Sequence, residues 1–155
     1  MNRDVFESLK AKGYNRIPVY RSVLADLDTP LSVYLKLADG PDAYLLESVE
    51  GGETWGRFSI IGLPCSRRYA VNGTTVTTWD DGAAVDETEV DDPRDFVAGL
   101  QKEFNAPRLD ELPVFTGGLV GYFAYEIVQH FEKRLQNAAK TDQLGTPEMV
   151  MLLSE

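Results

Sequence analysis

Residues 67–79 read Arg67-Arg68-Tyr69-Ala70-Val71-Asn72-Gly73-Thr74-Thr75-Val76-Thr77-Thr78-Trp79, and this stretch decides the fold. Residues 75–79 are all β-branched or aromatic, and the first half contains Tyr69 and Val71; these residue types favour strands. Asn72-Gly73 lies between the halves, and Asn-Gly is a strong signal for a tight turn between antiparallel strands. The stretch therefore predicts a β-hairpin with strands at 67–72 and 75–79.

Other strand-like segments lie on both sides of this hairpin. Segments 44–49 and 57–63 are separated by Gly51-Gly52, and Leu63-Pro64 ends the second. Segment 116–126 begins as a glycine-rich strand and runs into a helix, and 149–153 is an apolar strand. A short extended piece at 17–20 is expected at a sheet edge, because Pro18 cannot donate to a ladder.

Three segments carry helix signals. Residues 4–12 form an amphipathic pattern that ends at Gly13. Thr29-Pro30 and Asp92-Pro93 each combine a capping residue with a proline at the first helical position. We therefore predict an α+β fold with a mixed or mostly antiparallel sheet and helices packed outside.

The composition favours one globular domain over residues 1–155 and excludes several partners. Acidic side chains outnumber basic ones by 25 to 15, and the formal net charge of -10 repels nucleic acid and anionic membranes. The acidic run from Asp80 to Asp92 is expected to be a solvated loop. Without a leader or an apolar run of about 20 residues, the chain is expected to be cytoplasmic and to have no membrane partner.

Cys65 and His130 are the only residues of their kinds in the chain. A lone cysteine excludes an internal disulfide and a thiolate metal cluster. A Cys65–His130 nucleophilic pair is also disfavoured, because no neighbouring cation or helix start marks Cys65 as an activated thiol.

Segment 44–49 combines apolar and polar groups in a way that suits a ligand. Strand alternation places Tyr44, Leu46 and Ser48 on one face and Glu47 on the other. An aromatic amino acid needs an apolar slot for its ring, acceptors for its amino group and a donor for its carboxylate. Glu47 or Ser48 supplies the acceptor, and Arg57 supplies the donor. The alternative is structural: Ser48 is a small residue near a strand end, and Glu47 faces solvent.

Five motifs, in order along the chain, resemble one enzyme family. They are Ile17-Pro18-Val19-Tyr20, Thr29-Pro30-Leu31-Ser32-Val33-Tyr34, Tyr44-Leu45-Leu46-Glu47-Ser48, Gly56-Arg57-Phe58-Ser59-Ile60-Ile61-Gly62 and Gly117-Gly118-Leu119-Val120-Gly121-Tyr122-Phe123-Ala124-Tyr125-Glu126. Together they resemble the amino-terminal domain of anthranilate synthase component I.

The resemblance implies a fragment of a larger two-domain α/β sandwich enzyme. The whole enzyme converts chorismate to anthranilate and pyruvate with Mg²⁺, using ammonia from a glutamine amidotransferase subunit. The chorismate and metal residues belong to the carboxy-terminal catalytic domain, so this chain is expected to hold no cofactor and to be inactive alone. The apolar run that ends at the last residues of the chain also suggests a cut from a longer polypeptide.

The resemblance also implies that tryptophan, the end product, binds here as an inhibitor. Leu46, Glu47 and Ser48 carry over directly from the family's Leu-Leu-Glu-Ser element. Arg57 matches a basic position that follows a loop of variable length.

Two alternatives stay open: the matching domain of aminodeoxychorismate synthase component I of folate synthesis, and a domain that docks a subunit without binding a small molecule.

For Gly117-Gly118, a phosphate-binding loop is disfavoured because the lysine and Ser/Thr of such loops are missing, and close backbone packing is preferred.

Overall fold

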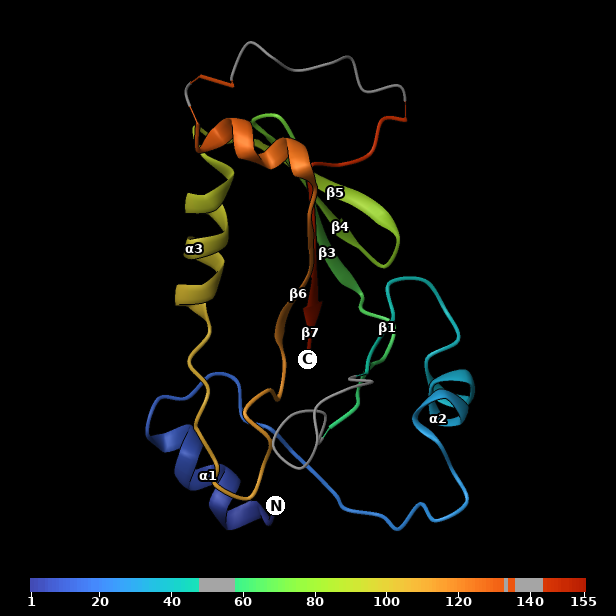
Figure 1. The fold of residues 1–155 in the computed structure, drawn as a ribbon. Helices are drawn as coiled ribbons and strands as arrows, with labels where there is room; N and C mark the ends of the chain where they lie inside the picture. The colour runs from blue at the N-terminus through green and yellow to red at the C-terminus, as the bar shows by residue number, and fades with distance from the viewer. Residues whose placement is uncertain (48–57, 133, 136–143) are drawn as a thin grey trace. The chain divides into compact units, whose positions relative to one another are not determined.

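The computed structural model describes residues 1–47, 58–132, 134–135 and 144–155 (Figure 1). The chain divides into two compact units. The first contains residues 1–65, 103–117 and 154–155, and the second contains residues 66–102 and 118–153. Each unit is described separately below.

The second unit is built on a five-stranded sheet in the order β5-β4-β3-β7-β6. The strands are β3 (Arg67–Asn72), β4 (Thr75–Asp80), β5 (Ala83–Glu89), β6 (Gly118–Phe123) and β7 (Met149–Ser154). β3 pairs antiparallel with both β4 and β7, and β4 pairs antiparallel with β5. The predicted hairpin is confirmed, and so is the α+β class with its antiparallel sheet.

The turn of the β3–β4 hairpin lies one residue later than the Asn-Gly signal suggested. Asn72 still pairs with Thr75, so the two-residue loop is Gly73-Thr74. Gly73 has a φ of 59°, while Thr74 stays out of the left-handed region. Glycine at the first loop position with positive φ is the requirement of a type II′ turn.

The acidic run was wrongly predicted as a loop, because residues 83–89 form β5. Asp81 and Gly82, with φ values of 47° and 79°, reverse the chain between β4 and β5 in the manner of a type I′ turn. Pairing with β4 then supplies the backbone hydrogen bonds of β5. Its side chains are exposed, as expected of a solvated run, and charges on an edge strand oppose pairing with another chain.

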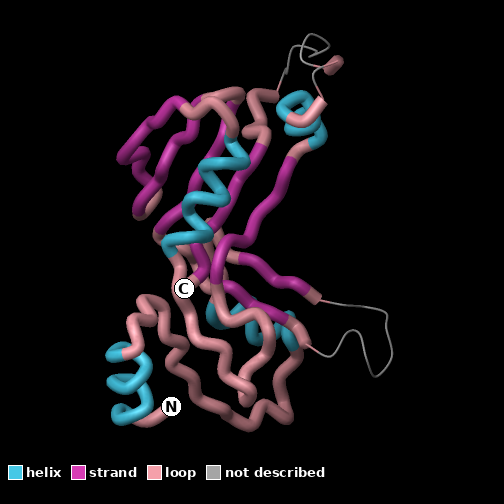
Figure 2. Tube along the Cα trace, turned by 90° about the vertical axis from the view of Figure 1, so that its left-hand side faces the viewer, coloured by secondary structure: helices cyan, strands magenta, loops and turns pink. Residues whose placement is uncertain are grey.

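Helix α3 (Pro93–Glu103) lies over one face of this sheet (Figure 2). The ring of Tyr69 meets that of Phe96 edge-on, with centroids 5.5 Å apart. Val71, Val76 and Met149 are completely buried, and the register places both Val76 and Met149 opposite Val71. The core of this unit therefore lies along β3 and its two neighbours.

Strand β6 depends on a glycine for its place beside β7. A Cβ at Gly121 would lie 1.8 Å from the carbonyl oxygen of Val150, so no other residue fits without moving the backbone. Gly121 thus has the close backbone packing preferred for this glycine-rich segment, whereas a Cβ at Gly118 would meet no atom within 4 Å. The helix expected after β6 is a 3₁₀ helix, η1 (Tyr125–His130).

The first unit contains α1 (Arg3–Ala11), α2 (Pro30–Leu37), β1 (Tyr44–Leu46) and β2 (Ile60–Gly62). Asn2 caps α1, and Thr29 and Ser32 form a reciprocal capping box at α2, so both predicted helices are confirmed. The sheet edge expected at 17–20 was wrong, because no described strand runs beside this segment. The hydroxyl of Tyr20 donates to Glu111 instead.

Among the described residues, no helix is both long enough and apolar enough to cross a membrane.

Replacing Gly121 with alanine should destabilise the chain, since the new methyl group collides with the Val150 carbonyl. We expect a loss of about 1–3 kcal/mol in the free energy of unfolding, measured by urea denaturation. Gly99→Ala in α3 is the matched control, because its Cβ meets no atom within 4 Å and alanine favours a helix. A Gly121→Ala variant as stable as the parent would contradict this packing.

Asp92 should contribute to stability in a pH-dependent way. It accepts the backbone N–H of Arg94 at 2.8 Å, and the Arg94 side chain lowers the Asp92 pKa to about 2. Because the folded-state pKa is lower than the unfolded one, the contribution is complete above about pH 4 and is lost as the pH falls toward 2. Asp92→Ala should therefore destabilise the chain much more at pH 7 than at pH 2, as measured by urea denaturation. Asp92→Asn, which keeps the cap, should cost less at pH 7. Equal losses at both pH values would contradict the role of the charge.

Candidate functional site

The β1–β2 pair carries the first part of the predicted ligand site. Tyr44 pairs with Gly62, Leu45 with Ile61 and Leu46 with Ile60. A Cβ at Gly62 would lie 2.0 Å from the Tyr44 ring, so the ring packs across a position that only glycine can fill. The Tyr44 hydroxyl lies 2.7 Å from Oγ of Ser154, which holds the ring in place.

Leu46 and Glu47 lie at the end of β1 with their side chains accessible. Leu46 is 48% exposed, although a leucine on a strand is usually covered. Glu47 follows it directly, and its Oε1 lies 3.5 Å from the hydroxyl of Ser59, which follows Phe58 and precedes β2. The structure thus gives a half-exposed leucine at the end of β1 and an exposed glutamate at the next residue.

Ser48 and Arg57, the other two predicted site residues, lie outside the described residues. The structure therefore gives the position of Leu46 and Glu47 only, and the four-residue set stays a prediction.

The thiol and the imidazole have separate environments. Burial raises the pKa of the Cys65 thiol, and the nearby charges of Asp42 and Glu155 raise it further, which opposes thiolate formation. His130 lies 2.8 Å from Oε2 of Glu148, whose other oxygen accepts from Gln129. In the described ranges, no three His, Cys, Asp or Glu side chains are placed to hold a metal ion, so no residue here is assigned to Mg²⁺.

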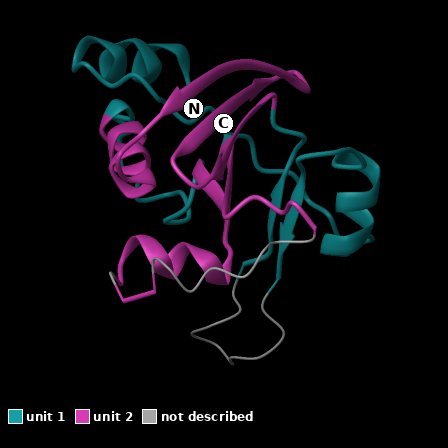
Figure 3. Ribbon diagram, turned by 90° about the horizontal axis from the view of Figure 1, so that it is seen from above, with its two compact units in different colours: residues 1–65, 103–117, 154–155 teal, residues 66–102, 118–153 magenta. Residues whose placement is uncertain are grey.

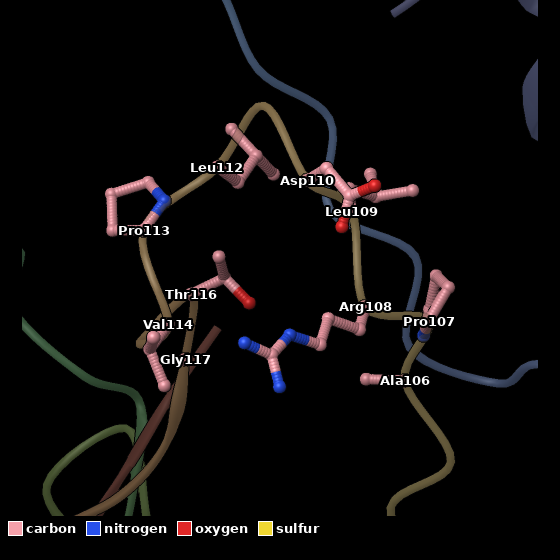
Figure 4. A pocket seen from close by; sticks show the side chains of 10 residues that line it. All are labelled: Ala106, Pro107, Arg108, Leu109, Asp110, Leu112, Pro113, Val114, Thr116 and Gly117. Atoms are coloured by element: carbon pink, nitrogen blue, oxygen red, sulfur yellow. The ribbon is translucent and has the colours of Figure 1, made fainter.

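A second feature of the first unit is a cavity of about 340 Å³ in the loop between α3 and β6 (Figure 4). We call it the loop pocket. It is lined by Ala106, Pro107, Arg108, Leu109, Asp110, Leu112, Pro113, Val114, Thr116 and Gly117. No sequence motif marks this loop as a site; Arg108 is its one basic residue.

Three sets of contacts hold this loop. At its start, the Asn105 N–H donates to Asn15 Oδ1 at 2.8 Å, and the Asn15 N–H donates to the Asn105 carbonyl at 2.9 Å. In its middle, the Tyr20 hydroxyl donates to Glu111 at 2.8 Å. Backbone hydrogen bonding and this contact lower the Glu111 pKa, so the carboxylate stays charged.

The third contact lies at the end of the loop. A Cβ at Gly117 would lie 2.9 Å from the Ser154 carbonyl oxygen, and the φ of Gly117 is 133°. Both facts require glycine at this position.

Known proteins similar to this chain are consistently of one kind. Anthranilate synthase component 1 of Pseudomonas putida is 49% identical over 155 residues, which is 100% of this chain and 31% of that protein. The same protein of Neisseria meningitidis serogroup B is 47% identical over 158 residues, covering 100% of this chain and 32% of its own length. The chain is homologous to the amino-terminal region of anthranilate synthase component 1.

The chain spans about a third of the length of these anthranilate synthase relatives. No protein-family model matches it. Among solved structures, anthranilate synthase component I from Streptococcus pneumoniae TIGR4 aligns with a TM-score of 0.46 and 24% identity, over 88% of this chain and 28% of that one. Because the homology to anthranilate synthase component 1 covers the whole chain, it includes both the β1–β2 pair and the loop pocket.

The Tyr44–Ser154 contact should stabilise the β1–β2 pair. Tyr44→Phe keeps the ring over Gly62 and removes only the hydroxyl, so we expect a loss of about 1 kcal/mol in the free energy of unfolding. Tyr34→Phe in α2 is the matched control, because no described residue bonds to its hydroxyl. Ser154→Ala should cost a similar amount, and the double variant should cost little more than either single one. Additive losses in the double variant would show that the two hydroxyls do not interact.

Proposed function

We propose that this chain is the tryptophan-binding, feedback-regulatory region of an anthranilate synthase component I. The observation that carries the proposal is the 49% identity to anthranilate synthase component 1 over all 155 residues. The β1–β2 pair supports it, because the half-exposed Leu46 and the exposed Glu47 are an apolar group and an acceptor of the kinds that an aromatic amino acid requires.

In the proposed complex, Leu46 contacts the indole ring. Either the Glu47 carboxylate or the Ser48 hydroxyl accepts from the ammonium group. Arg57 pairs with the ligand carboxylate through its planar guanidinium. Tyr44, two residues before Leu46 on β1, packs its ring across Gly62 and meets the Ser154 hydroxyl.

The whole enzyme is proposed to convert chorismate and ammonia to anthranilate and pyruvate in the cytoplasm. A glutamine amidotransferase subunit supplies the ammonia. The residues for chorismate and Mg²⁺ are assigned to a carboxy-terminal catalytic domain that this chain does not contain, and residues 1–155 act as the single amino-terminal domain. We therefore propose that this chain alone is inactive and that it works by contact with the catalytic domain.

Inhibition is proposed to be heterotropic. Tryptophan binds better to a conformation in which catalysis is unproductive and so lowers the active population. By linkage, chorismate and tryptophan weaken each other's binding by the same factor.

Two other functions remain to be separated from this one by experiment. A product assay with chorismate distinguishes anthranilate from aminodeoxychorismate, and the relatives favour anthranilate. Calorimetric titration of the enzyme with tryptophan distinguishes a ligand-binding domain from one that only docks a subunit.

Ser48→Phe should yield an active enzyme that tryptophan no longer inhibits. The phenyl group fills the proposed slot for the indole without touching chorismate. The measurements are the inhibition constant for tryptophan and the kcat of anthranilate formation in a full-length enzyme that carries this chain. We expect the inhibition constant to rise at least about tenfold, which corresponds to about 1.4 kcal/mol of lost binding, with kcat nearly unchanged.

Ser22→Phe is the matched control, because Ser22 is exposed and far from β1 in sequence. It should keep normal inhibition. If Ser48→Phe is active and still fully inhibited by tryptophan, the proposed site is wrong.

A further inference from the structure

The turn of the β3–β4 hairpin, in the second unit (Figure 3), contains the chemically labile pair Asn72-Gly73. An asparagine loses its amide when the backbone nitrogen of the next residue attacks the side-chain carbonyl carbon. A side chain on that next residue obstructs the attack, and glycine has none. Asn72 is the one asparagine of the chain that a glycine follows.

The other described asparagines have their side-chain amides in use. Oδ1 of Asn2 caps α1. The Asn15 amide donates to a backbone carbonyl at 2.6 Å and accepts a backbone N–H at 2.8 Å, and the Asn105 amide donates to a backbone carbonyl at 3.1 Å. The side chain of Asn72, by contrast, is exposed and hydrogen-bonds to no described residue. Its carbonyl carbon is therefore accessible to a nucleophile and to water.

The Gly73 nitrogen, which is the nucleophile, is also accessible. Asn72 and Thr75 form the closing pair of the hairpin, so the first N–H of the two-residue loop lies outside the ladder. Within the described ranges, the Gly73 N–H donates to no backbone or side-chain acceptor. Loss of its proton to hydroxide therefore breaks no hydrogen bond of the fold.

Asn72 has backbone pairing on one side only. The pairs between β3 and β7 run from Arg68 to Val71, so among the described residues Asn72 is paired with Thr75 alone. The attack requires Asn72 to leave the extended conformation, which opens this last pair. The next pair, Val71 with Val76, is completely buried and stays formed. Opening one terminal pair requires much less free energy than unfolding the chain.

We propose that Asn72 is a site of spontaneous deamidation in the folded chain. The deprotonated Gly73 nitrogen attacks Cγ of Asn72, and the bond from Cγ to the side-chain nitrogen breaks. That nitrogen takes up a proton and leaves as ammonia, so a five-membered succinimide ring remains.

Water then opens the succinimide, and no other reactant is needed. Cleavage between the ring nitrogen and Cγ gives aspartate at position 72. Cleavage between the ring nitrogen and the α-carbonyl carbon gives isoaspartate, in which the backbone passes through Cβ and Cγ and is longer by one methylene.

Isoaspartate at position 72 should weaken the hairpin. The extra methylene lies in the backbone of the residue that closes the ladder, so the pair with Thr75 and the two-residue turn cannot both keep their geometry. The new carboxylate also lies in the same row of the sheet as Glu89, which pairs with Thr75 from β5. Both carboxylates are exposed to solvent, so the effect of the charge should be the smaller one.

The test is mass spectrometry of the folded chain during storage in a mildly alkaline buffer. Trypsin cleaves after Arg68 and Arg94, and the fragment 69–94 contains Asn72 as its only side-chain amide. Replacement of NH₂ by OH in the mass of this fragment therefore reports Asn72 alone. We expect a first-order loss of the amide and two products of equal mass, of which one co-elutes with the fragment of Asn72→Asp. The fragments that contain Asn15 and Asn105 should stay unchanged over the same time.

Asn72→Gln is the matched variant, because it keeps an amide and leaves Gly73 in place. Its longer side chain must close a six-membered ring, so the rate of amide loss should fall at least about tenfold. The parent chain unfolded in urea gives the rate without the ladder, and the folded chain should react more slowly but still measurably.

Urea denaturation of the fully converted chain tests the effect on the hairpin. A population should unfold at a lower urea concentration than Asn72→Asp, which carries the same charge without the extra methylene. Identical midpoints would show that isoaspartate does not weaken the hairpin.

The proposal is overturned if the folded chain keeps the Asn72 amide while the unfolded chain loses it, if Asn72→Gln reacts as fast as the parent, or if Asn15 or Asn105 reacts as fast as Asn72.

Discussion

The antiparallel pairing of β3 with β7 is the interaction on which the second unit depends. It joins residues about 80 positions apart in the chain and places Val71 opposite Met149, both completely buried. Such long-range pairing costs loop-closure entropy, which only the burial of apolar side chains along the whole strand can offset. Strand β6 then joins the sheet only because Gly121 allows the backbone of β7 to come close.

In the first unit, Ser154 has a comparable role. Its hydroxyl meets the Tyr44 hydroxyl, and its carbonyl oxygen lies where a side chain at position 117 would be. Within the first unit, Ser154 therefore lies beside both Tyr44 of β1 and Gly117 at the end of the pocket loop.

Local signals predicted most of the elements correctly. Capping residues and prolines at the first helical position located α2 and α3, because these residues satisfy backbone donors wherever they occur. The errors arose where distant partners decide the result. An acidic segment became β5 because β4 offered it hydrogen bonds, whereas residues 17–20 found no strand to pair with among the described residues.

The α+β class, the hairpin at 67–79 and the family resemblance could be inferred from the sequence, since all three rest on local residue patterns and their order. The sequence also singled out Leu46 and Glu47 through their motif, but not the exposure of Leu46. Only the tertiary structure decided the strand order and the loop pocket. Both depend on contacts between residues far apart in the chain, such as Tyr20 with Glu111, and no local pattern encodes which distant side chain will be within reach.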